Sequence, residues 1–196
     1  QSSPTTPVDI TDGKTMSDFE IQDQITDFLI GGSDTSAYTI IMAIILLLNH
    51  PEKLKNLRIE LKSASLKYLN AIIDETFRLF PVTLTVTASI WKLHRSKQIW
   101  GQDVDEFIPE RWFNLDPKIR NDAYYPFGSG SRFCIGNNFA LMEIRIILSA
   151  LLINFDFVVK EDADLQIVQF ITPSLRSKKF EVKATRLREG QNLNNA

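Results

Sequence analysis

The 196-residue chain has little cysteine and histidine, with one cysteine, Cys134, and two histidines, His50 and His94. A single cysteine cannot form a disulfide bond within the chain. The histidines lie far from each other and from the cysteine in the sequence, so we expect no zinc site made of clustered cysteine and histidine ligands. The formal net charge is −2, and a chain this close to neutral predicts no nucleic-acid partner.

Nor does the chain contain an uninterrupted apolar run long enough to cross a membrane. Residues 28–48 reach the required length of about 20 residues, but glycine and polar residues at positions 31–35 interrupt this segment. The remaining run, residues 40–48, is too short, so the segment predicts a helix buried inside a globular protein. The chain opens at Gln1 without a basic segment and an apolar core, and we therefore expect no signal peptide.

Helix start and stop signals predict four main helices. Ser17 and Glu20 form the capping box S-x-x-E at the start of the first helix. Asn49 followed by Pro51 is typical of the start of the second, and Pro81 ends the third. The predicted helices cover residues 17–48, 51–61, 66–80 and 137–152.

Short strands complete the predicted fold. Runs of β-branched and aromatic residues predict strands at residues 82–90, 155–159, 165–171 and 180–184. The fourth helix is apolar almost all round, and we expect it to be deeply buried. The predicted fold class is mainly α with a small β portion, folded over residues 17–188. The polar leader, residues 1–16, and the tail, residues 189–196, are expected to be disordered.

Cys134 lies in the glycine-rich segment FGSGSRFCIG, directly before the fourth helix. A helix N-terminus favours the thiolate, and Gly130 and Gly136 allow the backbone to approach a flat ligand closely. Phe127 can pack beside the sulfur, and Arg132 can pair with a carboxylate of the ligand. Two interpretations follow from these residues: a thiolate ligand of haem iron, or an inert cysteine in a glycine-rich turn.

The segment FGSGSRFCIG resembles the haem-loop pattern of the cytochrome P-450 family, F-x-x-G-x-R-x-C-x-G, at every fixed position. Three other segments are similar to motifs of this family and follow its order. They are GGSDT at residues 31–35, which resembles the oxygen-handling patch of the long distal helix, ETFR at residues 75–78, which resembles the E-x-x-R motif, and PERW at residues 109–112, which resembles the P-E-R-[FW] segment. The resemblance extends over about residues 18–187.

This resemblance implies the C-terminal half of the cytochrome P-450 fold and a haem-thiolate monooxygenase. Haem b (iron protoporphyrin IX) would be the cofactor, with Cys134 as the axial ligand of the iron and Phe127, Gly130, Arg132 and Gly136 at the haem. The implied partners are dioxygen, a lipophilic small-molecule substrate and an electron-donating reductase. A eukaryotic parent would be located on the endoplasmic reticulum membrane through an anchor absent from this chain.

Two further groups of residues take roles from the resemblance. Asp34 and Thr35 would be catalytic, with Asp34 delivering protons to dioxygen and Thr35 positioning the donor. The alternative for this pair is a helix kink with a capped polar pair. Glu75, Arg78 and Arg111 would form a buried structural network that fixes the scaffold of the haem loop. The alternative for Glu75 and Arg78 is a solvated surface pair.

The chain also departs from the family pattern. The segments before the distal helix are absent, residues 60–68 form a shorter connection than usual, and residues 79–90 contain no lysine, arginine or histidine. Arg132 is then the only obvious partner for the haem propionates. These departures predict a fragment, or a gene model with missing exons, that retains haem weakly and is not a competent monooxygenase by itself. The alternatives are an inactive truncated remnant and a helical interaction module that binds through exposed apolar surface.

Overall fold

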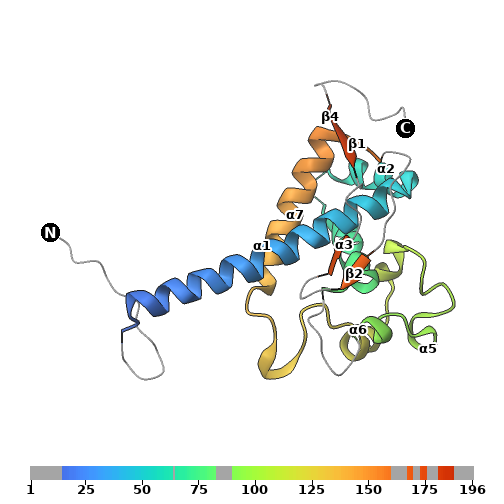
Figure 1. Ribbon diagram of the computed structural model, residues 1–196. Coiled ribbons are helices and arrows are strands. Elements are labelled where there is room, and N and C mark those ends of the chain that lie inside the picture. Colours follow the sequence, from blue (N-terminus) through green and yellow to red (C-terminus); the bar gives the residue numbers. More distant parts are fainter. Residues whose placement is uncertain are drawn as a thin grey trace. The chain divides into compact units, whose positions relative to one another are not determined.

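The structure, a computed structural model (Figure 1), describes residues 15–63, 65–82, 90–159, 167–169, 173–175 and 181–187. Most of the predicted leader, the predicted tail, and residues 83–89 of the first predicted strand lie outside these residues. The chain divides into two compact units, residues 1–34 and 35–196. Helix α1 (Asp18–Leu48) includes the residues on both sides of this division.

The described part of the first unit is the N-terminal portion of α1. The predicted capping box is present: the Ser17 backbone N–H donates to Glu20 Oε2 at 2.8 Å, and the Glu20 N–H donates to Ser17 Oγ at 3.3 Å. This pair satisfies backbone donors that the start of a helix would leave unpaired. The large apolar side chains of this portion are exposed, namely Phe19, Ile25, Phe28, Leu29 and Ile30.

The second unit is mostly helical in its described residues. Pro51 starts α2, because its fixed φ suits the first turn of a helix. Pro81 follows the end of α3, since proline cannot continue the hydrogen-bond pattern of a helix. After α1, the helices are α2 Pro51–Glu60, α3 Lys67–Leu79, α4 Ile90–Leu93, α5 Lys97–Trp100, α6 Pro117–Ala123 and α7 Asn137–Asn154, with 3-10 turns η1 Pro109–Phe113 and η2 Gly130–Arg132.

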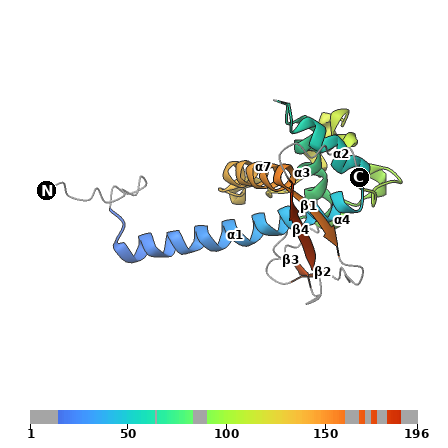
Figure 2. The same cartoon turned by 90° about the horizontal axis from the view of Figure 1, so that it is seen from above.

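Two antiparallel strand pairs supply the β portion (Figure 2). Strand β1 (Phe155–Val159) pairs with β4 (Val182–Arg186), and β2 (Ile167–Gln169) pairs with β3 (Pro173–Leu175). The predicted fold class, mainly α with a small β portion, is confirmed. Strand β1 has the predicted bounds, whereas β4 ends two residues beyond the predicted strand at residues 180–184, because strand ends depend on the pairing partner more than on local composition. Of the strand predicted at residues 82–90, Ile90 is helical and begins α4.

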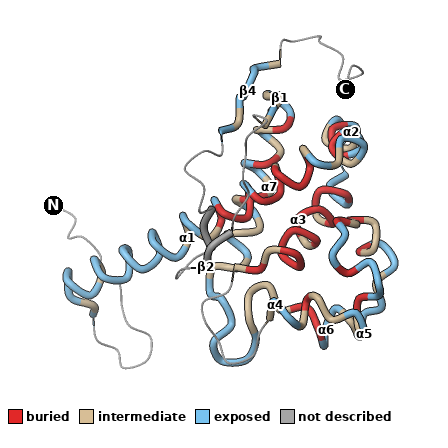
Figure 3. The backbone as a smooth tube through the Cα atoms, turned by 45° about the vertical axis from the view of Figure 1, so that its right-hand side comes forward, coloured by how far each residue is buried: buried red, intermediate tan, exposed pale blue. Residues whose placement is uncertain are grey.

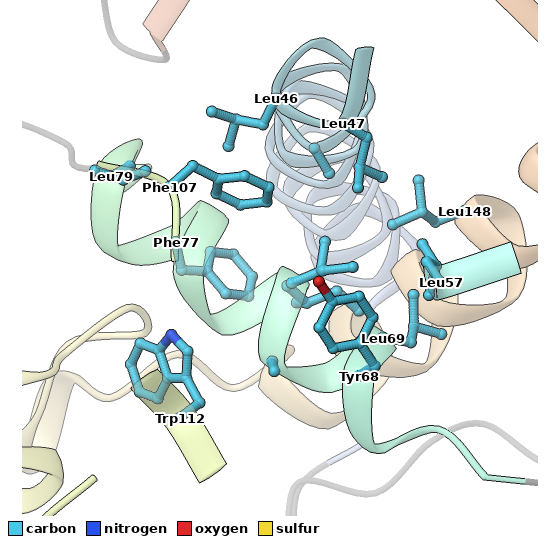
Figure 4. Packing of buried hydrophobic residues seen from close by; sticks show 14 of the residues in the cluster. Leu46, Leu47, Leu57, Tyr68, Leu69, Phe77, Leu79, Phe107, Trp112 and Leu148 are labelled. Carbon is cyan, nitrogen blue, oxygen red and sulfur yellow. The ribbon is translucent and has the colours of Figure 1, made fainter. Parts of the chain in front are cut away.

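The core of the second unit forms around α3. Figure 4 shows apolar side chains from several elements converging there, among them Leu47 of α1, Leu57 of α2, Leu69 of α3 and Leu148 of α7. Full burial of one such side chain contributes about 1.5–3 kcal/mol. Buried positions run along most of α3 (Figure 3). This helix is therefore the element against which the rest of the second unit packs.

The prediction that Asn49 caps α2 is wrong. The Asn49 N–H donates to the Ile45 carbonyl at 3.1 Å, so Asn49 still belongs to the last turn of α1. His50 is the N-cap of α2 and makes no side-chain cap, because its ring Nδ1 lies 2.7 Å from the Leu46 carbonyl oxygen. A proline in the first turn has no N–H to be capped, which reduces the need for a capping side chain.

The predicted deep burial of α7 is also wrong. Its buried residues form one stripe, Ile144, Leu148 and Leu152, whereas most of the other large apolar residues on the helix are exposed: Phe139, Met142, Ile146, Ile147 and Ile153. A helix that is apolar all round is typical of an element with neighbours on every side, and the described residues cover one side of α7. By length and composition alone, α1 and α7 are each apolar enough to cross a membrane, a property that core helices of globular proteins share.

Candidate functional site

The segment that carries Cys134, residues 127–136, turns back on itself and ends at the start of α7; we call it the cysteine loop. The Cys134 N–H donates to the Phe127 carbonyl at 3.0 Å and closes the loop. Gly128 and Gly130 have φ values of 75° and 68°, in the left-handed region where other residues are strained. The two glycines therefore allow the chain to reverse direction before it reaches the cysteine.

The Cys134 side chain is exposed and lies three residues before Asn137, the first residue of α7. Gly136 is the N-cap of α7, and a Cβ placed on it would lie 3.9 Å from Cys134 Sγ. Glycine at this position therefore keeps space open beside the sulfur. Arg132 is also exposed, so its guanidinium can reach a carboxylate of a bound molecule. The cysteine loop thus presents a thiol and a cation to solvent.

Phe127 connects the cysteine loop to α3. Its ring meets that of Phe77 edge to face, with the centroids 5.2 Å apart and the planes at 66°. Such aromatic pairs contribute about 0.5–1.5 kcal/mol beyond the burial of their area. Phe77 is buried in the core (Figure 4). The contact therefore ties the loop to the helix that carries the E-x-x-R segment.

Arg78 lies on α3 and is completely buried. Its Nε and Nη2 donate to the two carboxylate oxygens of Glu75, each at 2.8 Å. The other guanidinium hydrogens go to the carbonyls of His94 at 3.0 Å, Val104 at 2.6 Å and Glu106 at 3.1 Å. All five donors of the guanidinium are thus used, which is what a buried arginine requires.

Glu75 is the common acceptor of this network. Besides the two bonds from Arg78, it accepts from Arg111 Nε at 3.0 Å and from the Ile108 backbone N–H at 3.0 Å. Trp112 Nε1 donates to its second oxygen at 2.9 Å. The carboxylate is completely buried. The alternative of a solvated surface pair is therefore wrong, because the charges are paired out of contact with water.

The structure thus brings Glu75, Arg78 and Arg111 together, and their role in holding the cysteine loop stays a prediction. Sequence reasoning missed Trp112 as a member of the network, although it stands beside Arg111 in the segment PERW. It also missed His94, a completely buried residue whose ring Nε2 accepts a hydrogen bond from the Tyr125 N–H at 3.1 Å. An isolated histidine carries no local signal for such a contact.

A second polar group joins α3 to α6. Tyr124 Oη donates to Asp74 Oδ1 at 2.9 Å, and Arg120 Nη2 forms an ion pair with Asp74 Oδ2 at 3.3 Å. Burial raises the pKa of Asp74, and the hydrogen bond from Tyr124 offsets part of this effect. The pKa of Tyr124 lies well above its ordinary value, first because of burial and then because of the Asp74 charge. The tyrosine therefore remains a hydrogen-bond donor at neutral pH.

The predicted catalytic pair lies on α1, which is helical throughout residues 31–35. Asp34 is exposed and belongs to the first unit, whereas Thr35 is half-buried and belongs to the second. The Thr35 carbonyl accepts a hydrogen bond from Thr39 Oγ1 at 3.1 Å. Side chains that bond back to the helix in this way bend helices. The catalytic role of the pair stays a prediction.

Comparisons with known proteins agree with the resemblance. The family model described as Cytochrome P-450 matches residues 5–87 and 83–184. The bifunctional cytochrome P-450/NADPH–P-450 reductase 2 of Bacillus subtilis (strain 168) is 34% identical over 205 residues, which cover 87% of this chain and 19% of the relative. The putative cytochrome P-450 cyp-13B1 of Caenorhabditis elegans is 34% identical over 184 residues, which cover 75% of this chain and 36% of the relative.

The chain therefore spans between about a fifth and just over a third of the length of these two curated relatives. The family model matches most of the chain, including the cysteine loop and the residues of the Glu75 network. This chain belongs to the cytochrome P-450 family.

Proposed function

We propose that this chain is the haem-binding C-terminal part of a haem-thiolate monooxygenase, with haem b as the cofactor and Cys134 as the axial ligand of the iron. The observation that carries the proposal is the geometry of the cysteine loop. Its closing hydrogen bond, from the Cys134 N–H to the Phe127 carbonyl, leaves the Cys134 side chain exposed at the start of α7. The loop is also tied through Phe127 to the core.

The residues of the loop fit a haem. Free N–H groups and partial positive charge at the N-terminus of α7 would stabilise an anionic sulfur ligand. Gly130 and Gly136 leave the backbone open to a flat ring, and the exposed Arg132 would pair with a propionate. When bound, a thiolate-ligated haem supplies the dioxygen chemistry by which one oxygen atom enters a lipophilic small-molecule substrate, with electrons from a reductase. The name of the Bacillus relative, which includes a reductase, supports this last partner.

The other assigned residues of this chain would support that chemistry from a distance. Glu75, Arg78 and Arg111 would hold the segments on either side of α5 and thereby keep the cysteine loop in place. Asp34, exposed on α1, would take protons from solvent, and Thr35 would position the donor. Neither group would bind the haem directly.

The test of haem ligation is an absorption spectrum of the chain reconstituted with haemin, reduced and treated with carbon monoxide. We expect the Soret band typical of a thiolate ligand, and we expect Cys134→Ala to abolish it while Ser131→Ala, an exposed neighbour in the same loop, leaves it unchanged. An unchanged band in Cys134→Ala would remove Cys134 from the role of axial ligand.

A second candidate is an inactive remnant that binds haem weakly or not at all. The observation that favours it is the exposed apolar surface of α7 and of the cysteine loop, where the exposed fraction is 83% for Ile135 and 61% for Phe139. Such a surface promotes self-association. Absence of a thiolate-type band in the reconstituted wild-type chain would favour this candidate.

The proposed proton path is tested by Thr35→Ala in a full-length protein that carries this chain. We expect product formation to fall while hydrogen peroxide rises, because proton delivery to dioxygen is disturbed. Ser33→Ala is the matched control, since the Ser33 hydroxyl lies on the same helix and donates to the Leu29 carbonyl at 2.7 Å. An unchanged ratio of product to electrons consumed in Thr35→Ala would contradict the proton-path assignment.

A further inference from the structure

His94 is a completely buried histidine that the proposed function leaves without a role. It directly follows α4, and its backbone N–H donates to the Ile90 carbonyl at 2.8 Å. Its ring lies among aromatic side chains, with centroids 5.4 Å from Tyr124 and 6.5 Å from Trp100. Burial of a polar ring in such surroundings costs free energy unless its nitrogen atoms form hydrogen bonds.

Two further polar atoms of His94 accept hydrogen bonds, from different parts of the site. The His94 carbonyl accepts from Arg78 Nη1 at 3.0 Å, so the backbone of His94 belongs to the Glu75 network. The ring Nε2 accepts from the Tyr125 N–H at 3.1 Å. The Tyr125 carbonyl in turn accepts from the Gly128 N–H at 3.2 Å, which begins the turn of the cysteine loop.

We propose that His94 is a positioning residue, and that its neutral ring, through Nε2, couples the Glu75 network to the first turn of the cysteine loop. The Tyr125 N–H can only donate, so Nε2 must carry a lone pair and the ring proton must lie on Nδ1. An imidazolium would present two donors and would lose the contact with Tyr125. This inference rests on the proposed function for its consequence at Cys134, but the contact itself does not depend on haem.

The surroundings of the ring keep it neutral. Burial is the main cause that lowers the pKa of His94 to about 4. The cations that face it, Arg78 of α3 and Arg95 of the following turn, act in the same direction. The ring of Tyr124 contacts that of His94, and the Tyr124 hydroxyl adds no charge at neutral pH, because its pKa is raised well above the ordinary value. At neutral pH the ring is therefore available as an acceptor.

Amide hydrogen exchange of the haem-free chain, resolved by NMR, tests the coupling. In His94→Phe an aromatic ring is kept and the acceptor is lost, so exchange of the Tyr125 and Gly128 amides should rise about tenfold to a hundredfold relative to the buried amide of Leu148. In His94→Gln, which keeps an acceptor, the rise should be less than about tenfold. The matched control is His50→Phe, a half-buried histidine whose ring contacts the Leu46 carbonyl, and it should leave Tyr125 unchanged.

Equal protection of Tyr125 in wild type and His94→Phe, relative to Leu148, would overturn the proposal. If His94→Phe fails to fold, the tautomer of His94 in the wild-type chain decides, read from the nitrogen chemical shifts of its ring. A proton on Nδ1 supports the proposal and a proton on Nε2 refutes it. Haemin titration of the same variants measures the consequence for the cysteine loop, and we expect His94→Phe to bind haemin more weakly than His94→Gln does. Failure of the wild-type chain to bind haemin would count against the proposed function and leave the exchange result standing.

Discussion

At the scale of single residues, Arg78 shows why the E-x-x-R segment carries arginine. Its guanidinium donates to one carboxylate and to three carbonyls, one at the end of α4 and two in the segment that follows α5. A lysine has three donors on one nitrogen atom and cannot satisfy five acceptors in a plane. The residue therefore fixes the relative positions of α3 and the segments around residues 94–106.

Replacement of the shared carboxylate should be severe. Glu75→Gln removes the charge that compensates Arg78 and Arg111, and breaking a buried ion pair from one side costs about 3–5 kcal/mol. We expect the free energy of unfolding, measured in urea, to fall by that amount. Glu106→Gln is the control, because its side chain is exposed and surface changes usually stay within about 0.5 kcal/mol. A fall in the free energy of unfolding of Glu75→Gln no larger than that of Glu106→Gln would contradict the stabilising role of the network.

His94 should also make the stability of the fold depend on pH. Its pKa falls from an ordinary value of 6.5 to about 4 in the folded chain, so the unfolded chain binds the proton more tightly. The stability associated with this residue is therefore complete above about pH 6.5 and decreases as the pH falls toward about 4, by at most about 3 kcal/mol. Urea unfolding at pH 7 and pH 4.5 measures the decrease, and His94→Gln should lack it. A wild-type decrease no larger than that of His94→Gln would contradict the assignment.

At the scale of elements, α3 begins with a cap supplied from α2. The Glu60 carboxylate accepts from the Tyr68 N–H at 2.8 Å and from the Leu69 N–H at 2.9 Å. A carboxylate at a helix N-terminus satisfies unpaired donors and complements the helix dipole. Leu66, the N-cap residue of α3, supplies no side-chain cap. Glu60 therefore takes over a function that is usually local.

Removal of this cap should destabilise α3 measurably. We expect Glu60→Ala to lower the free energy of unfolding by about 1–2 kcal/mol, and to increase hydrogen exchange at the Tyr68 and Leu69 amides. Lys62→Ala, an exposed residue next to the same turn, should change neither. Unaltered exchange at both amides in Glu60→Ala would rule out the capping role.

The elements that could be predicted from the sequence are those with local signals. The box of Ser17 and Glu20 and the proline at position 51 set the starts of α1 and α2, and both starts are found within a residue of the prediction. The cap of α3 could not be predicted, since Glu60 lies in the preceding helix. The contact of His94 with Tyr125, 31 residues away, likewise has no local pattern. The cysteine loop could be recognised because its spacing is specific over ten residues.

At the scale of the whole molecule, α7 shows where composition misleads. The composition of α7 is typical of a helix buried on all sides, yet in the described residues only the stripe of Ile144, Leu148 and Leu152 is buried, with Leu141 and Leu151 packed beside it. The sequence cannot show which neighbours are present. The exposed remainder of α7 is an apolar surface in contact with solvent, and such a surface promotes association.

Two substitutions on α7 should therefore behave in opposite ways. Leu148→Ala, at a completely buried position, should lower the free energy of unfolding by about 2–5 kcal/mol. Ile146→Gln, at a position with 60% exposure, should change it by less than about 0.5 kcal/mol and reduce self-association. Urea unfolding and sedimentation velocity measure the two effects. A large loss of stability in Ile146→Gln would show that this side of α7 is covered in solution.

The position of the Glu75 network in the chain has a consequence for synthesis on the ribosome. All of its side-chain members lie between residues 75 and 112, and the longest separation from Glu75 is 37 residues, to Trp112. A chain leaves the ribosome N-terminus first, so the last member of the network emerges before Cys134 does. Contacts between residues close in sequence also form faster than distant ones. The scaffold can thus assemble first, and the nascent cysteine loop would then emerge beside a surface that is already in place to receive it.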